Sequence, residues 1–334
     1  MPDISQIPPL SPSTPSGAAT VDVVIPVRNG EQTISAALAS VFAQTRPPNR
    51  IIVVDDGSTD GTRNILGAVG DRVEIIATEP RGVSHARNVG VAAASADFIA
   101  FLDADDRWRA DKLRRQLDIF AGDPRVGVVY CATALARPNG AARRVERPKL
   151  KGRIFNGLLG GGQAGNSSSV MFRRELVART GCYDEALSHG EDFDFFLRLA
   201  RVCEFDFAPE VLVDVVENPG SVSRRKTNPD ELAASIAQVA SILRKYADGK
   251  PSFVWAQIFR RQMLRAVVSR GLGWRGLLQT RERLRAISPR TARSIWPGHA
   301  SFFFLTALEV AAFGGKRGLE QITARLSPTR VDGE

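Results

Sequence analysis

The chain has 334 residues, of which 43% are hydrophobic, and its formal net charge is +9. This composition is typical of a soluble globular protein with one large domain or two ordinary ones. The basic charge favours anionic partners such as nucleotide diphosphates, lipid headgroups or nucleic acid. The three cysteines are an odd number without metal-ligand spacing, which argues against a disulfide framework or a zinc site and favours reduced thiols in a cytoplasmic protein.

The first segment is rich in proline and serine. It lacks both the basic and the apolar regions of a signal peptide. We therefore expect residues 1–19 to be a disordered arm.

From residue 20 onward, apolar strands alternate with amphipathic helices. A strand over residues 21–27 is followed by Ile34, Leu38, Val41 and Phe42, which share one face of a helix. A second strand follows over residues 50–56, and another helix precedes the apolar run at 98–102. Such alternation predicts an α/β fold with a parallel, doubly wound sheet and right-handed crossovers.

The run Phe98–Leu102 ends in three acids, Asp103, Asp105 and Asp106. An open α/β sheet binds its ligand at the carboxyl ends of its strands. Clustered carboxylates repel one another there unless a hard cation such as Mg²⁺ or Mn²⁺ bridges them to a phosphate. A D-x-D alone is also typical of a solvated turn, and Asp106 can instead cap a helix that begins near Trp108. The acids indicate a metal only together with other motifs.

Five motifs in order resemble a family 2 glycosyltransferase of the GT-A fold. They are Val24–Glu31, Asp55–Asp60, Gly82–Gly90, Phe101–Asp106 and Gly190–Asp192. The resemblance implies a Rossmann-like, mostly parallel sheet with flanking helices over residues 20–228. It also implies transfer of a sugar from a nucleotide-diphosphate donor to a hydroxyl acceptor, either a polysaccharide or other glycan or a lipid-linked glycan.

The resemblance places the donor, a UDP- or dTDP-sugar, at the ends of the first strands. The donor-binding residues would be Pro26, Arg28, Asn29, Asp55, Asp56, Arg87, Asp103 and Arg224. Asp56 would accept a hydrogen bond from the base N3–H, because a carboxylate only accepts. Arg87 and Arg224 suit a diphosphate. Arg28 stands where the family frequently has an aromatic residue that stacks on the base, and a guanidinium can also stack on a planar ring.

The same resemblance assigns the chemistry. Asp105 would coordinate Mn²⁺ or Mg²⁺ directly, and Asp103 would contact the ribose or the metal through water. The metal neutralises the departing diphosphate. Asp192 would be the general base and Glu191 would orient the acceptor, although two acids at a helix N-terminus also stabilise its dipole. One base facing one leaving group implies inversion, and Asn218 stands where many members carry a histidine ligand.

Residues 229–334 are helical in pattern and basic. Leu232, Ile236, Val239, Leu243 and Tyr246 form an amphipathic seam, and a series of arginines follows from Arg260 to Arg285. The phenylalanine-rich segment at 301–313 is too short to span a bilayer. This extension either packs on the catalytic domain or lies on an anionic membrane surface. In the second case the protein would be peripheral at the inner face of the membrane.

Two other functions stay open from the residues alone. A nucleotidyltransferase of related fold also uses acids and Mg²⁺, but Val27–Glu31 lacks the Gly-rich, basic loop it usually needs. A non-catalytic module could bind membrane or nucleic acid through the basic extension. Nucleic acid is the less expected partner, because acids line the predicted cleft.

Overall fold

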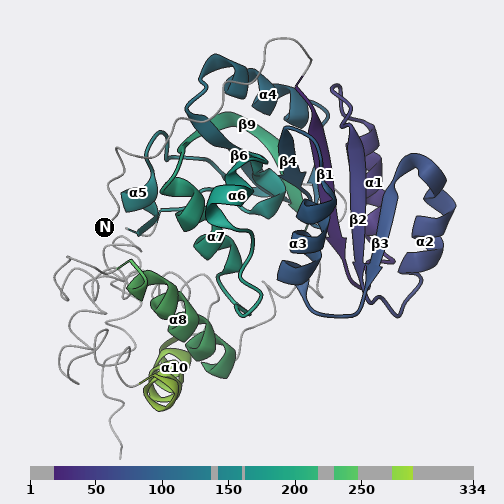
Figure 1. Ribbon diagram of the computed structural model, residues 1–334. Helices are drawn as coiled ribbons and strands as arrows, with labels where there is room; N and C mark the ends of the chain where they lie inside the picture. The colour runs from purple at the N-terminus through teal and green to yellow at the C-terminus, as the bar shows by residue number, and fades with distance from the viewer. Residues whose placement is uncertain (1–18, 137–141, 160–161, 217–228, 247–272, 289–334) are drawn as a thin grey trace, which may run out of the picture. The chain divides into compact units, whose positions relative to one another are not determined.

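A computed structural model describes residues 19–136, 142–159, 162–216, 229–246 and 273–288 (Figure 1). The chain divides into two compact units between residues 221 and 222. Residues 1–18 of the expected arm, most of the basic extension, and the predicted residues Arg224 and Asn218 lie outside the described ranges.

The first unit is built on a nine-stranded mixed sheet with the order β3-β2-β1-β4-β8-β6-β9-β5, to which β7 adds beside β6. The strands are β1 (Val21–Val27), β2 (Arg50–Asp56), β3 (Glu74–Thr78), β4 (Phe98–Phe101), β5 (Arg107–Trp108), β6 (Val126–Ala136), β7 (Ala142–Glu146), β8 (Met171–Arg173) and β9 (Glu204–Val216). The half formed by β1 to β4 is parallel, as expected. In the other half, β8 runs antiparallel to β4 and β6, while β9 is parallel to β6.

Helices cover both faces of this sheet. They are α1 (Ile34–Phe42), α2 (Thr62–Val69), α3 (Val83–Ala93), α4 (Lys112–Gly122), α5 (Phe155–Leu159), α6 (Leu176–Thr180) and α7 (Glu191–Ala200), with 3₁₀ turns η2 (Gly70–Arg72) and η3 (Ser167–Ser169). Alternate residues of a strand point to opposite faces. Val23 and Ile25 belong to the core cluster that contains Ile34 and Leu38 of α1, whereas Val24 lies against Gly90 of α3. Figure 1 shows α1 and α3 on either side of the strands β1 and β2. Burial on both faces explains why β1 and β2 are continuous apolar runs. The expected α/β class is confirmed.

The sequence prediction for the segment after Asp106 was wrong. Residues Arg107–Trp108 form the short strand β5 beside β9, and α4 begins only at Lys112. Asp106 is buried and caps no helix; its carboxylate accepts a hydrogen bond from the Ser168 hydroxyl at 2.6 Å. The strand forms because an antiparallel partner is available from a distant part of the chain, which local propensity does not register.

The described part of the second unit contains two helices, α8 (Pro229–Arg244) and α10 (Gly273–Ile287), which pack on each other. Leu232, Ile236 and Leu243 are buried, in agreement with the predicted seam. Arg283 of α10 forms an ion pair with Asp230 of α8 at 2.9 Å. Within the described ranges, the helices are all too short or too polar to cross a membrane.

Close packing of α3 on β1 depends on Gly90. A Cβ at Gly90 would lie 2.3 Å from Val24 Cγ1, and Val24 is fully buried. We expect Gly90→Ala to lower the free energy of unfolding by about 1–3 kcal/mol, because the helix must move away from the strand. Chemical denaturation measures this change.

Gly67→Ala on α2 is the matched control. A Cβ there meets nothing within 4 Å, so alanine causes no clash. Alanine loses less backbone entropy on folding than glycine does, so the substitution should stabilise the protein by about 0.5–1 kcal/mol. Stabilisation by both substitutions would contradict the close approach of α3 to β1.

Candidate active site

The ends of β1 and β2 lie side by side, with Val27 paired to Asp55 in the sheet register. Asn29 follows β1 in the left-handed region at φ 53°, which Asn tolerates better than most residues. Its side-chain Oδ1 accepts from the Thr59 N–H at 2.8 Å, and its own N–H donates to Ser58 Oγ at 2.9 Å. The two loops are thereby held together. Pro26 is buried within β1, and Arg28 is exposed beside Asn29.

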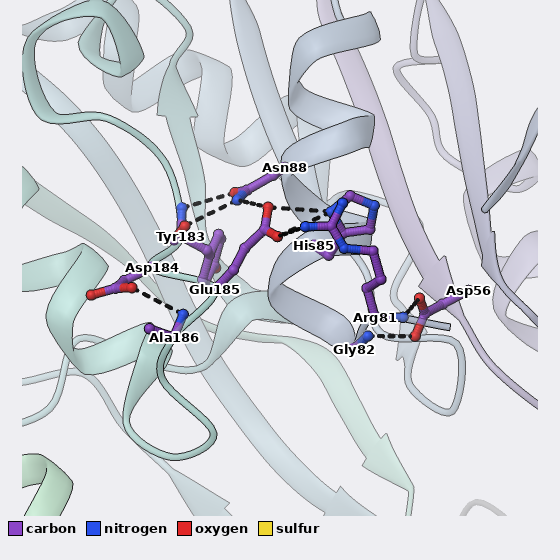
Figure 2. A network of polar contacts seen from close by, with 9 residues as sticks. All are labelled: Asp56, Arg81, Gly82, His85, Asn88, Tyr183, Asp184, Glu185 and Ala186. Carbon is purple, nitrogen blue, oxygen red and sulfur yellow. Dashed lines mark hydrogen bonds and ion pairs between the residues drawn. The ribbon is translucent and has the colours of Figure 1, made fainter. Parts of the chain in front are cut away.

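Asp55 and Asp56 are both buried but have different partners. Asp55 accepts from the Ser58 N–H at 2.9 Å and from Arg63 Nε at 2.8 Å. Burial alone would raise the pKa of Asp55, but these hydrogen bonds outweigh it and lower the pKa. Asp56 accepts from the N–H groups of Arg81 and Gly82, at 2.8 and 2.9 Å. It thus joins the end of β2 to the turn that opens α3 (Figure 2).

Arg87 on α3 is the centre of the site. Its guanidinium is almost fully buried and donates to Asp103 Oδ1 at 2.8 Å and to Asp192 Oδ1 at 3.0 Å. Glu191 lies at 3.8 Å from the same guanidinium. Burial acts to lower the pKa of Arg87, but Asp192 and Asp103 raise it well above the ordinary value. One permanent cation therefore connects the acid after β4 with the two acids that begin α7.

A turn of three buried serines, η3, supports these acids from the other side. Ser168 Oγ accepts from the Asp103 N–H at 3.0 Å and donates to Asp106 at 2.6 Å. Burial raises the pKa of Asp106 well above its ordinary value, and the charges of Asp103 and Asp105 add to the effect. Ser167 Oγ donates to Asp192 Oδ1 at 2.7 Å. The turn therefore contacts both the D-x-D segment and the predicted base.

Glu191 and Asp192 form the first turn of α7, after Gly190 in the left-handed conformation at φ 76°. Neither carboxylate caps the helix in the usual way, because the residue at the cap position is the glycine. Burial raises the pKa of Glu191, and the charge of Asp192 raises it further. Both acids are partly exposed, at 21% for Glu191 and 32% for Asp192, so a ligand can reach them.

A second network fastens the segment before α7 to α3 (Figure 2). The Asn88 side chain accepts from the Tyr183 N–H at 2.9 Å and donates to the Tyr183 carbonyl at 3.0 Å. Glu185 receives hydrogen bonds from Asn88 at 3.0 Å and from Arg81 at 2.9 Å, and lies 3.2 Å from His85 Nδ1. These hydrogen bonds lower the pKa of Glu185, Asn88 first among them. The network fixes where α7 begins.

The structure brings four of the predicted residues into one cluster of ion pairs. Arg87 joins Asp103, Glu191 and Asp192, while Asp56 reaches the same helix through its N-terminal turn. The sequence reasoning missed Ser167, Ser168, Tyr183 and Glu185. Their residue types carry no chemical signal of their own, and their partners lie between 16 and 104 residues away in the chain.

Asp103 and Asp105 fit a hard divalent cation in chemistry and number. Asp103 uses Oδ1 for Arg87, and carboxylate oxygens are the ligands that Mg²⁺ and Mn²⁺ prefer. In the described part of the chain, no group of three or more His, Cys, Asp or Glu side chains forms a metal cage. Two carboxylates nevertheless suffice where substrate phosphates complete the shell, as is usual for Mg²⁺.

Comparison with known proteins gives the family. Residues 22–181 match the model of Glycosyl transferase family 2. An uncharacterized glycosyltransferase of Nostoc sp. is 32% identical over 174 residues, which are 48% of this chain and 52% of that protein. The succinoglycan biosynthesis protein ExoO of Rhizobium meliloti is 32% identical over 248 residues, 68% of this chain and 69% of that protein. An uncharacterized glycosyltransferase of Rickettsia typhi is 28% identical over 204 residues, 58% of this chain and 62% of that protein, so the chain spans less than two thirds of this relative and of the Nostoc one.

Among solved structures, S. aureus TarS 1–349 in complex with UDP-GlcNAc aligns with a TM-score of 0.59 over 83% of both chains, at 18% identity. This similarity concerns the fold, which is of the GT-A type. The coverage and identity of ExoO, together with the family match, show that the chain belongs to glycosyl transferase family 2 and is a glycosyltransferase.

Proposed function

We propose that the chain transfers a sugar, with inversion, from a nucleotide-diphosphate donor to a hydroxyl group of a glycan or lipid-linked acceptor, assisted by Mn²⁺ or Mg²⁺. The observation that carries this proposal is the hydrogen bonding of Asp103 and Asp192 to the same guanidinium of Arg87. Asp103, which would contact the metal of the leaving diphosphate, and Asp192, which would take the proton of the attacking hydroxyl, thus meet at one arginine. Family membership sets aside both the nucleotidyltransferase and the non-catalytic alternatives.

The donor would lie across the ends of β1 and β2. Pro26, Arg28 and Asn29 supply one wall and Asp55 and Asp56 the other. Each oxygen of Asp56 accepts one backbone N–H, which leaves a lone pair for the N3–H of uracil or thymine. We therefore favour a UDP- or dTDP-sugar. The UDP-GlcNAc complex of TarS supports a uridine donor only by analogy of fold.

A divalent metal would be held by Asp105 and Asp103 and would neutralise the diphosphate as it leaves. Arg87 keeps Asp103 oriented from the buried side. Arg224 would add a second cation toward the diphosphate, and this part of the proposal rests on the sequence.

Asp192 would accept the proton of the acceptor hydroxyl as that oxygen attacks the anomeric carbon. Burial and the charge of Asp192 raise the pKa of Glu191. Glu191 would hold the acceptor through a hydrogen bond. A single displacement of this kind inverts the anomeric centre.

The acceptor and the place of action are also part of the proposal. The relative ExoO is named for succinoglycan biosynthesis, which favours a polysaccharide or its lipid-linked precursor. We assign catalysis to residues 20–228 and propose that 229–334 lies at the inner face of a membrane. Of the arginines predicted to meet lipid, Arg283 and Arg285 already pair with Asp230 and Glu282. The remaining arginines would carry that contact.

The metal is tested by measuring donor hydrolysis and transfer with a panel of UDP-, dTDP- and GDP-sugars. We expect turnover with Mn²⁺ or Mg²⁺ and loss of turnover in excess EDTA. Asp105→Ala should abolish turnover while the protein stays folded, because one metal ligand is removed. Full activity in EDTA would eliminate the metal from the proposal.

Asp192→Asn tests the base. An amide has nearly the shape of the carboxylate but cannot take up a proton, so transfer should fall by about 100- to 10,000-fold. Donor affinity, measured by calorimetry, should remain. A variant that melts and loses donor binding would show that Asp192 serves the helix dipole instead.

Arg87→Met tests the central cation. The substitution leaves Asp103, Glu191 and Asp192 without their shared cation, and we expect a loss of about 2–4 kcal/mol in unfolding free energy. The pKa of Glu191 is raised by burial and by Asp192, so Glu191 is the acid that takes up a proton as the pH falls; this removes part of the repulsion, and the loss should be smaller near pH 5 than near pH 8. Urea denaturation at both pH values measures it.

Arg114→Met is the control for that experiment. Arg114 also contacts two aspartates, Asp111 and Asp118, but on an exposed helix face. Its loss should cost no more than about 0.5 kcal/mol. Equal losses of unfolding free energy in the two variants would show that the buried cation of Arg87 stabilises the protein no more than an exposed ion pair does.

A further inference from the structure

The predicted base has two oxygens in different surroundings. Oδ1 of Asp192 accepts from Arg87 Nη1 at 3.0 Å and from Ser167 Oγ at 2.7 Å. Among the described residues, the hydrogen bonds to Asp192 all end on Oδ1. The side chain is 32% exposed, whereas Ser167 is fully buried. The buried side of the carboxylate is thus occupied by donors, and its accessible side is left to a ligand.

The hydroxyl of Ser167 has a defined direction. Ser167 Oγ lies 3.2 Å from the Tyr183 hydroxyl, and either could donate in that contact. An ionised carboxylate only accepts, so the single hydrogen of Ser167 must point to Asp192. The Tyr183 hydroxyl is then the donor to Ser167. Burial raises the pKa of Tyr183 well above its ordinary value, which keeps this hydroxyl protonated.

Tyr183 is itself held firmly. Its backbone makes two hydrogen bonds with the Asn88 side chain, drawn in Figure 2. Its ring packs against Phe195 at 4.7 Å and edge-on against Phe101 at 5.6 Å between centroids. A rigid aromatic ring therefore fixes the far end of the hydrogen-bond series from Tyr183 through Ser167 to Asp192.

We propose that Ser167, fixed by Tyr183, is a positioning residue that orients Asp192 so that Oδ2 takes the proton of the acceptor. The inference rests on the proposed role of Asp192 as the base. Arg87 alone places the carboxylate near the donor site but allows it to rotate about its Cβ–Cγ bond. A second donor on the same oxygen, from a different direction, stops that rotation.

The test is the kinetics of Ser167→Ala, measured with the nucleotide sugar that the panel of UDP-, dTDP- and GDP-sugars selects. A hydrogen bond to a charged group is lost, so kcat should fall by about tenfold to a hundredfold, with donor affinity unchanged. The hydrogen bond favours the ionised carboxylate. Its removal should therefore move the acid limb of the kcat profile to higher pH. Tyr183→Phe, which deletes one oxygen atom, should shift both quantities in the same direction by less.

Ser169→Ala is the matched control in the same turn. Ser169 Oγ contacts only the backbone of Asn166 among the described residues and does not approach Asp192. It should lower the melting temperature without moving the pH profile. A profile moved equally by both variants, or unmoved by Ser167→Ala, would overturn the proposal.

The Asp192→Asn background separates this inference from the proposed function. If Ser167 acts through the carboxylate, Ser167→Ala should cause no further loss of kcat in Asp192→Asn, because the group it orients is gone. Additive losses would show that Ser167 has only a structural role. Full transfer by Asp192→Asn alone would instead refute Asp192 as the base.

Discussion

The site depends on one buried arginine shared by carboxylates that lie far apart in the chain. Asp103 follows β4 and Asp192 begins α7, yet both hydrogen-bond to Arg87. Without the cation, these two acids would repel one another, because both lie within hydrogen-bond distance of the same guanidinium and are only partly exposed. The guanidinium is suited to the task because it stays charged and presents several donors in one plane. Its position is set by α3, which Gly90 allows to approach β1 closely. Packing in the sheet and charge in the site are therefore coupled through one helix.

The helix α3 connects several parts of the candidate site. The turn just before it supplies the backbone donors for Asp56, its middle supplies Arg87, and Asn88 hydrogen-bonds to Tyr183 in the segment before α7. The turn η3 makes the complementary connection, since neighbouring serines contact Asp192 and the D-x-D segment. Two rigid pieces thus hold the acids from two directions. Such support is what a site needs when the relative position of donor and base decides the rate.

Sequence patterns predicted the parallel half of the sheet because its strands are apolar on both faces and its helices follow directly. They also singled out Asp103 and Asp192, which hydrogen-bond to Arg87, and Asp56, which hydrogen-bonds to the turn before α3, although the roles of these residues stay predictions. They failed where a contact joins distant segments. The strand β5 forms where β9 pairs with it, and Ser167 meets Asp192 because the fold brings the first turn of α7 beside η3. From the sequence alone, Tyr183 is indistinguishable from any other buried aromatic residue, and its ring does pack against Phe195 in the core. Its hydroxyl becomes informative only when its partner is known.

The balance of charge gives a reason for the proposed metal that does not depend on family resemblance. Three carboxylates, Asp103, Glu191 and Asp192, lie within 3.8 Å of the one positive charge of Arg87. Asp105 adds a further acid two residues beyond Asp103.

A nucleotide diphosphate would bring more negative charge to the same place, and Arg87 is already hydrogen-bonded to the acids. The pKa values of Glu191 and Asp106 are raised, which favours the neutral forms of these two acids and lessens the excess of negative charge. A divalent cation held by Asp103 and Asp105, as proposed, would turn repulsion of the diphosphate into attraction. On this proposal the acids would repel a bare donor and attract one that arrives with its metal, so the residues proposed to hold the metal would also select the form of the donor that binds.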